Sequence, residues 1–153
     1  MPTSQYTGKA GHLAVMGEYC LRGYNVGMPE IDKGDDVFVV NDGSGAMWRL
    51  QVKTANPRKQ KTSLSFAYRV KEHSIQTAQT PELHFIFVMR IKNQWRFLVM
   101  DRSVLRNYVR SGLGTPTGDF RQITIVFHDD GRVIASDTEL RHHLEDWAAW
   151  PVL

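Results

Sequence analysis

The sequence predicts an α/β domain in which a mixed β-sheet is flanked by helices. Apolar residues recur at helical spacing near the start of the chain, and several later segments alternate between apolar and polar residues with the period of a strand. A capping-box pattern introduces the last segment. With 153 residues at 42% hydrophobic, the chain can bury one complete core but is short for two. We therefore expect a single domain over residues 1–153.

Helices are expected near both ends of the chain and once between them. Residues 11–22 have helical apolar spacing, and Gly23 can end that helix. A helix over residues 104–109 would be capped by Asp101 or Ser103. Ser136-Asp137-Thr138-Glu139 matches a capping box, which predicts a final helix that includes Leu140, Leu144, Trp147 and Ala148.

The predicted strands are short alternating runs bounded by turn residues. They cover residues 24–26, 36–40, 47–55, 63–70, 84–91, 95–100 and 122–127, with loops over residues 56–61 and 111–119. Trp147 and Trp150 are expected to pack into the core, with a partner surface as the alternative.

The first hairpin carries the most informative polar residues. Period-2 alternation separates two faces of its second strand: Trp48, Leu50 and Val52 on one, and Met47, Arg49, Gln51 and Lys53 on the other. If the turn is centred on Gly43-Ser44, Asp36 lies opposite Gln51, where the two side chains can share a ligand. Carboxylate and amide oxygens suit Mg²⁺, and the neighbouring lysine suits a phosphate.

The distribution of charge allows a nucleic acid partner. The net charge is +3 and the pI is about 9.1. Every charged residue from position 53 to position 71 is basic: Lys53, Arg58, Lys59, Lys61, Arg69 and Lys71. We expect this electropositive surface to adjoin the hairpin and its exposed loop residues to contact DNA, namely Arg58, Lys59 and Lys61.

The cysteine content and hydropathy indicate a cytoplasmic protein. Cys20 is the single cysteine, which excludes an internal disulfide framework, and it is expected to be a buried, inert thiol. No run approaches the roughly 18 apolar residues of a membrane span, and the first residues lack the apolar centre of a signal peptide. We therefore expect no membrane association.

The order helix, strand, strand, strand, with Asp36 entering the second strand and Gln51-x-Lys53 on the third, resembles the core of the PD-(D/E)XK nuclease superfamily. The string is similar to small single-domain members related to Holliday-junction resolvases and intron-encoded homing endonucleases, and covers about the first half of the chain. It comprises Gly11-His12-Leu13-Ala14-Val15, Arg22-Gly23-Tyr24-Asn25-Val26, Pro29, Asp32, Gly34, Asp36 and Gln51-Val52-Lys53-Thr54-Ala55. The resemblance implies a restriction-endonuclease-like core and hydrolysis of DNA phosphodiester bonds with Mg²⁺ or Mn²⁺.

The resemblance also implies roles for individual residues. Asp36 would be the central metal-binding carboxylate, and the Val52 carbonyl would complete the inner shell. Gln51 stands where most members have Glu or Asp, so it would ligate through its amide oxygen and add no charge. Lys53 would orient the attacking water and stabilise the charge that grows on the phosphate.

The helix acid is where the sequence departs from the family pattern. Many relatives have Glu directly after the helix glycine, and here that position holds His12, while Glu18 is the one acid on the helix. Six residues correspond to about 240° of rotation, so only one of the two can face the site. Three alternatives are open: Glu18 as a metal ligand, His12 as a phosphate or water contact, or neither. Glu30 and Asp32 could also supply the missing carboxylate.

These observations predict a metal-dependent DNA endonuclease. Cutting two strands requires two sites related by symmetry, so a homodimer is expected. The alternative is a catalytically inactive nuclease fold that binds nucleic acid or a protein partner, because Gln51 and the missing helix acid both reduce the charge available to hold a metal ion.

Overall fold

The computed structural model describes residues 3–31 and 33–147, in which the strands form two β-sheets. The first sheet has five strands in the order β1-β2-β3-β6-β7. Its β3 and β6 are parallel and its other neighbours antiparallel, so the predicted mixed sheet is confirmed. The strands are β1 (Asn25–Gly27), β2 (Val37–Val40), β3 (Met47–Ala55), β6 (Leu83–Ile91) and β7 (Gln94–Asp101).

The second sheet is antiparallel and has the order β11-β10-β9-β5-β4, with β8 paired to β9. Its strands are β4 (Arg58–Lys59), β5 (Ser63–Lys71), β8 (Thr115–Thr117), β9 (Phe120–His128), β10 (Val133–Ala135) and β11 (Thr138–Glu139). The β4–β5 hairpin and β8 correct the expectation that residues 56–61 and 111–119 are loops only.

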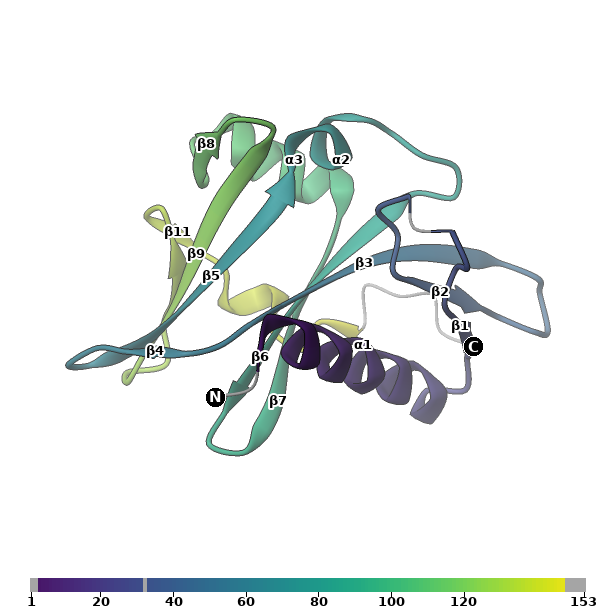
Figure 1. Cartoon of the computed structure of the whole chain (residues 1–153), viewed down its shortest axis with the longest axis horizontal. Helices are drawn as coiled ribbons and strands as arrows, with labels where there is room; N and C mark the ends of the chain where they lie inside the picture. The colour runs from purple at the N-terminus through teal and green to yellow at the C-terminus, as the bar shows by residue number, and fades with distance from the viewer. Residues whose placement is uncertain (1–2, 32, 148–153) are drawn as a thin grey trace.

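The layers are visible in Figure 1, where α1 (Ser4–Leu21) lies across the first sheet while α2 (Glu72–Gln76) and α3 (Arg102–Arg110) lie together at the top. Strand β6 is buried on both faces. Phe85, Phe87 and Met89 belong to one core cluster with residues of β5, β9 and α3, while Ile86 and Val88 pack in a second cluster with residues of α1. The first sheet is therefore the middle layer of the molecule, which is why β6 reads as a nearly continuous apolar run.

Helix α1 begins seven residues earlier than its apolar pattern predicts and buries Gly11, Val15 and Tyr19. A Cβ atom at Gly11 would lie 1.8 Å from Thr54 Oγ1, so glycine lets the helix backbone approach β3 closely. Cys20 is exposed, because it lies about 100° around the helix from Tyr19. The prediction of a buried thiol is therefore wrong.

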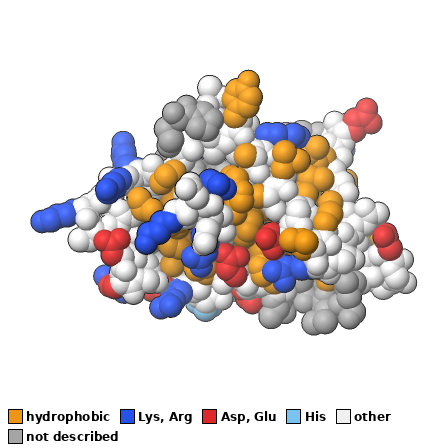
Figure 2. All heavy atoms as spheres, turned by 90° about the horizontal axis from the view of Figure 1, so that it is seen from below, with side chains coloured by type: hydrophobic (Ala, Val, Ile, Leu, Met, Phe, Trp, Pro, Cys, Tyr) orange, Lys and Arg blue, Asp and Glu red, His pale blue; other side chains and the backbone are white. Residues whose placement is uncertain are grey.

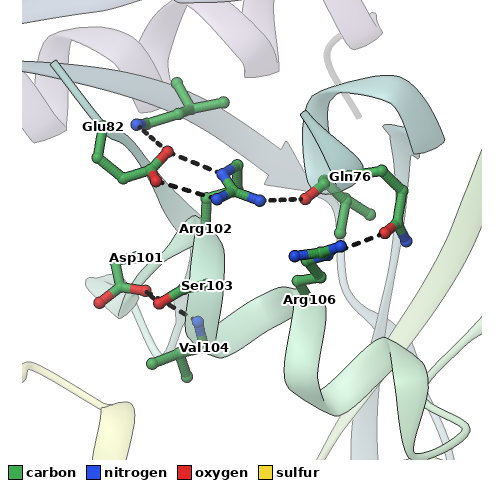
Figure 3. Close-up of polar contacts among 9 residues, drawn as sticks. Gln76, Glu82, Asp101, Arg102, Ser103, Val104 and Arg106 are labelled. Carbon is green, nitrogen blue, oxygen red and sulfur yellow. Dashed lines mark hydrogen bonds and ion pairs between the residues drawn. The ribbon is translucent and has the colours of Figure 1, made fainter. Parts of the chain in front are cut away.

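Buried Arg102, the first residue of α3, connects this helix to α2 and to the segment before β6 (Figure 3). Arg102 is 5% exposed and donates to both carboxylate oxygens of Glu82, at 2.8 and 3.0 Å, and to the Ile75 carbonyl at 3.0 Å. Burial favours the neutral acid, but the hydrogen bonds from Arg102 outweigh it and lower the pKa of Glu82. Asp101 caps α3 by accepting from the Val104 N–H at 2.8 Å, one of the two caps predicted.

The predicted C-terminal helix is wrong. Ser136 and Asp137 have φ values of 46° and 63° and form the turn between β10 and β11, in which Ala135 pairs with Thr138. Two central residues with positive φ favour a tight hairpin, whereas a helix N-cap needs an extended backbone. Arg141–His143 then form a short 3-10 helix.

Trp147 is partly buried and packs edge-on against Tyr19 at 5.5 Å between ring centroids, which confirms its core prediction. Trp150 and Ala148 lie outside the described residues. Within residues 3–31 and 33–147, no helix is long and apolar enough to cross a membrane.

Candidate metal and phosphate site

The hairpin register places Asp36 against β3 as predicted. Val37 pairs with Leu50, so the ladder continued by one residue sets Asp36 opposite Gln51. The Asp36 N–H donates to the Leu50 carbonyl at 2.7 Å, and its Oδ2 accepts from the Val52 N–H at 2.8 Å. The backbone N–H and the carboxylate of Asp36 are thereby both hydrogen-bonded to the backbone of β3, while 20% of its side chain stays exposed.

Gln51 brings an unsatisfied oxygen to this end of the hairpin. Its side chain is 3% exposed, and its Nε2 donates to the Gly34 carbonyl at 2.7 Å. That bond fixes the orientation of the amide, since a carbonyl can accept only from the nitrogen. Oε1 is buried and has no hydrogen-bond partner within the described structure. A buried orphan acceptor is costly, and a cation would satisfy it.

Helix α1 places a histidine over the carboxylate. The contact of Gly11 with Thr54 seats this part of the helix on β3, and the next residue, His12, has its Nε2 3.8 Å from Asp36 Oδ2. The His12 side chain is 24% exposed, so the pair is open to solvent at one side.

Glu18 lies on the other side of the buried stripe of α1. Its Oε2 pairs with Arg22 Nη2 at 3.4 Å, and both side chains are about one-third exposed. The structure therefore brings His12 to Asp36, and it engages Glu18 in an ion pair within the helix. Glu30 is exposed in the segment between β1 and β2, and Asp32 lies outside the described residues.

Lys53 and Val52 follow Gln51 on β3. The predicted faces are confirmed on the apolar side, where Trp48, Leu50 and Val52 pack in the core cluster that includes α1. Lys53 is partly buried and shares the Gln51 face, about 7 Å further along the strand. Val52 lies between them and is in register with Ile86 of β6.

An ion pair beside the site was not anticipated from the sequence. Asp35 is 4% exposed, and its Oδ2 lies 3.3 Å from Nη1 of Arg49. Arg49 lies on the Gln51 face two residues before Gln51 and is in register with Phe38. A basic residue on the polar face of this strand, close to the acidic Asp35-Asp36 strand entry, is the signal that could have revealed the pair. The contact ties the segment that carries Asp36 to β3.

The basic segment lies at the far end of β3 from Asp36. Arg58 and Lys59 are exposed on β4 and Lys61 is exposed in the following turn. Arg58 follows Gln51 by seven residues, roughly 23 Å of extended chain. Figure 1 draws β4 at the left tip and β2 at the right, and Figure 2 shows Lys and Arg side chains gathered at the left end. Of the expected electropositive surface, Lys53 therefore lies on β3 beside Gln51, whereas Arg58, Lys59 and Lys61 lie away from Asp36.

The residues assembled around Asp36 suit a hard divalent cation. A carboxylate and an unpartnered amide oxygen are oxygen ligands, and histidine nitrogen lies beside them. No cluster of three or more His, Cys, Asp or Glu side chains that could hold a metal occurs in the described part of the chain. A cation bound here would therefore need the Gln51 amide oxygen or backbone oxygens in addition to the Asp36 carboxylate.

Comparison with solved structures shows the class of fold. The chain superposes on the structure of a bacterial homing endonuclease, I-Ssp6803I, with a TM-score of 0.59 and 17% identity, covering 97% of this chain and 91% of the other. The chain thus has a mixed α/β fold similar to that of a homing endonuclease. No family model and no curated protein sequence matches it.

Proposed function

We propose that this protein is a metal-dependent endonuclease that hydrolyses DNA phosphodiester bonds, with a PD-(D/E)XK-type site. The observation that carries the proposal is the buried, unpartnered Oε1 of Gln51 opposite the carboxylate of Asp36. A cation bound between these two opposed positions would satisfy the orphan acceptor and the carboxylate together. The likeness in fold to a homing endonuclease supports the same reaction.

Mg²⁺ or Mn²⁺ would be held by the Asp36 carboxylate, Gln51 Oε1 and the Val52 carbonyl. Such an ion supplies a Lewis acid for the phosphoryl oxygen and a water of lowered pKa. Because Gln51 contributes no charge, the site carries one negative charge fewer than a site with two carboxylates, and weaker metal binding is expected.

The chain's own groups then act on the phosphate. Lys53 would place a positive charge against the phosphate oxygens as charge grows there, and its compact ammonium suits that role. His12, open to solvent beside Asp36, would hold a water or a phosphate oxygen by hydrogen bonding. Glu18, paired with Arg22, has no part in the reaction as we propose it.

DNA would run from this site to the basic segment. At 3.4 Å per base pair, the roughly 23 Å of extended chain from Gln51 to Arg58 spans at most about seven base pairs. Exposed cations at that distance would contact the backbone away from the cut: Arg58, Lys59 and Lys61. We further propose a cytoplasmic homodimer, because two antiparallel strands are cut by two sites related by symmetry.

Cleavage of supercoiled plasmid and of a branched oligonucleotide in Mg²⁺ and Mn²⁺ tests the proposal. Asp36→Ala and Lys53→Ala should abolish metal-dependent cutting, whereas Asp42→Ala, a change at an exposed turn of the same hairpin, should not. DNA binding without cutting by the parent protein would favour the alternative, an inactive nuclease fold that binds nucleic acid, for which the single carboxylate and the histidine on α1 are the supporting observations.

A further inference from the structure

An apolar hollow lies where the start of α1, the end of β3 and the β6–β7 hairpin meet. Its volume is about 450 Å³, and its lining includes Tyr6 and Ala10 of α1, Pro57, and Arg90 and Trp95 of the hairpin. The proposed reaction does not use this hollow. Figure 2 shows hydrophobic side chains gathered on the face that carries α1.

The hollow has the chemistry of a stacking site. Tyr6 is 73% exposed, so its ring is open to contact by a ligand. The guanidinium of Arg90, also in the lining, lies over the ring of Trp95, 5.0 Å from the ring centroid. Among the described residues of the lining, Arg90 is the one charged side chain and none is an acid. Aromatic faces beside a cation favour a flat, electron-rich ring attached to an anion.

The hollow is also close to the proposed metal site along both elements that form it. Thr54 and Asn56 line it, and they follow Val52, whose N–H binds Asp36, by two and four residues, roughly 7 to 13 Å. Ala10 in the lining precedes His12 by two residues on α1. That separation matches one or two nucleotides of an extended strand.

From this arrangement, and resting on the proposed function, we infer that the hollow binds an unstacked nucleobase one or two nucleotides from the phosphate at Asp36. The ring would stack on Tyr6 and Trp95, and Arg90 would contact the attached phosphate. The substrate would then be DNA with an unpaired nucleotide next to the cut, such as a branch or an overhang, because an unpaired base enters the hollow without the cost of unpairing and unstacking that a duplex base carries.

The test uses duplexes with a short single-stranded overhang that contains 2-aminopurine at successive positions, in EDTA so that no cutting occurs. Stacking in the hollow should quench the fluorescence at one or two positions. Tyr6→Ala should remove the quenching and weaken binding of overhang DNA by about 5- to 100-fold, with no effect on blunt duplex. Leu13→Ala, at another exposed apolar residue of α1, should change neither.

Trp95→Leu provides a second variant that keeps apolar bulk, since Trp95 is partly buried. Quenching that persists in both variants, or an absence of quenching when the parent binds the duplex, would overturn the stacking site and leave the nuclease proposal standing. Failure of the parent to bind any of these DNAs at low salt would overturn both.

Discussion

Replacement of Gly11 by alanine tests how α1 positions the site. The added Cβ would lie 1.8 Å from Thr54 Oγ1 and 2.9 Å from its Cβ. To restore ordinary contact at about 3.5 Å, helix and strand must separate by roughly 1.7 Å. Because His12 is the next residue, the separation would also carry its Nε2 away from Asp36.

The magnitude follows from two opposing effects. Overpacking of this kind costs about 3 kcal/mol, since the contact is far inside the van der Waals limit. Alanine is favoured over glycine within a helix by about 1 kcal/mol. The net loss of about 2 kcal/mol should lower Tm by about 4–8 °C in a chain of this size.

The same helix supplies matched controls for a thermal denaturation assay. A Cβ at Gly8 or at Gly17 would meet nothing within 4 Å, so Gly8→Ala and Gly17→Ala should each raise Tm by about 2–4 °C. Thr54→Ala should partly rescue Gly11→Ala, because it removes the nearest atom. A rise in Tm for Gly11→Ala equal to that of the controls would refute the close seating of α1 on β3.

Three further predictions concern charge and hydrogen bonding. Glu82→Gln should lower the free energy of unfolding by about 1 kcal/mol at pH 7, a value discounted for partial exposure of the pair. Because folding lowers the pKa of Glu82, the difference in unfolding free energy between the parent and Glu82→Gln should shrink as pH falls below 4.5. A difference between their urea midpoints that stays constant from pH 7 to pH 3 would contradict this. Gln51→Glu should lower the Tm of the metal-free protein, since a carboxylate oxygen would face the Gly34 carbonyl. The same variant should show a larger rise in Tm than the parent when Mn²⁺ is added. A rise equal to that of the parent would exclude Gln51 as a ligand. Replacement of Arg58, Lys59 and Lys61 together by alanine should weaken DNA binding at low salt and reduce the slope of log K against log salt concentration by about 2–3. Fluorescence anisotropy of labelled DNA measures both quantities. An unchanged slope would exclude phosphate contacts by these residues.

The first hairpin was predictable because its register depends on local information. A turn between residues 40 and 47 and strict alternation along 47–53 fix which residues face each other, and the observed pairs agree. The cap at Asp101 was predictable for the same reason, because a side chain two or three residues from a backbone N–H needs no tertiary information.

Other features depend on contacts that are distant in sequence. Ser136 and Asp137 form a hairpin turn and not the helix start that the capping-box pattern predicts, because pairing of Thr138 with Ala135 extends the second sheet. The choice of His12 over Glu18 depends on how α1 rotates on β3, which the contact between Gly11 and Thr54 decides. The basic segment lies far from Asp36 because the chain leaves the far end of β3 and continues into β4. The number of basic residues in a segment does not indicate where that segment lies relative to the site.

Binding of Mn²⁺, followed by the loss of its free-ion electron paramagnetic resonance signal, tests the proposed metal site independently of any cutting. The parent should bind Mn²⁺, Asp36→Asn should abolish binding, and Gln51→Leu should weaken it at least about tenfold. Lys53→Ala should bind as tightly as the parent or more tightly, because it removes a nearby positive charge. Equal affinity in the parent and in Asp36→Asn would contradict a metal centre at this hairpin.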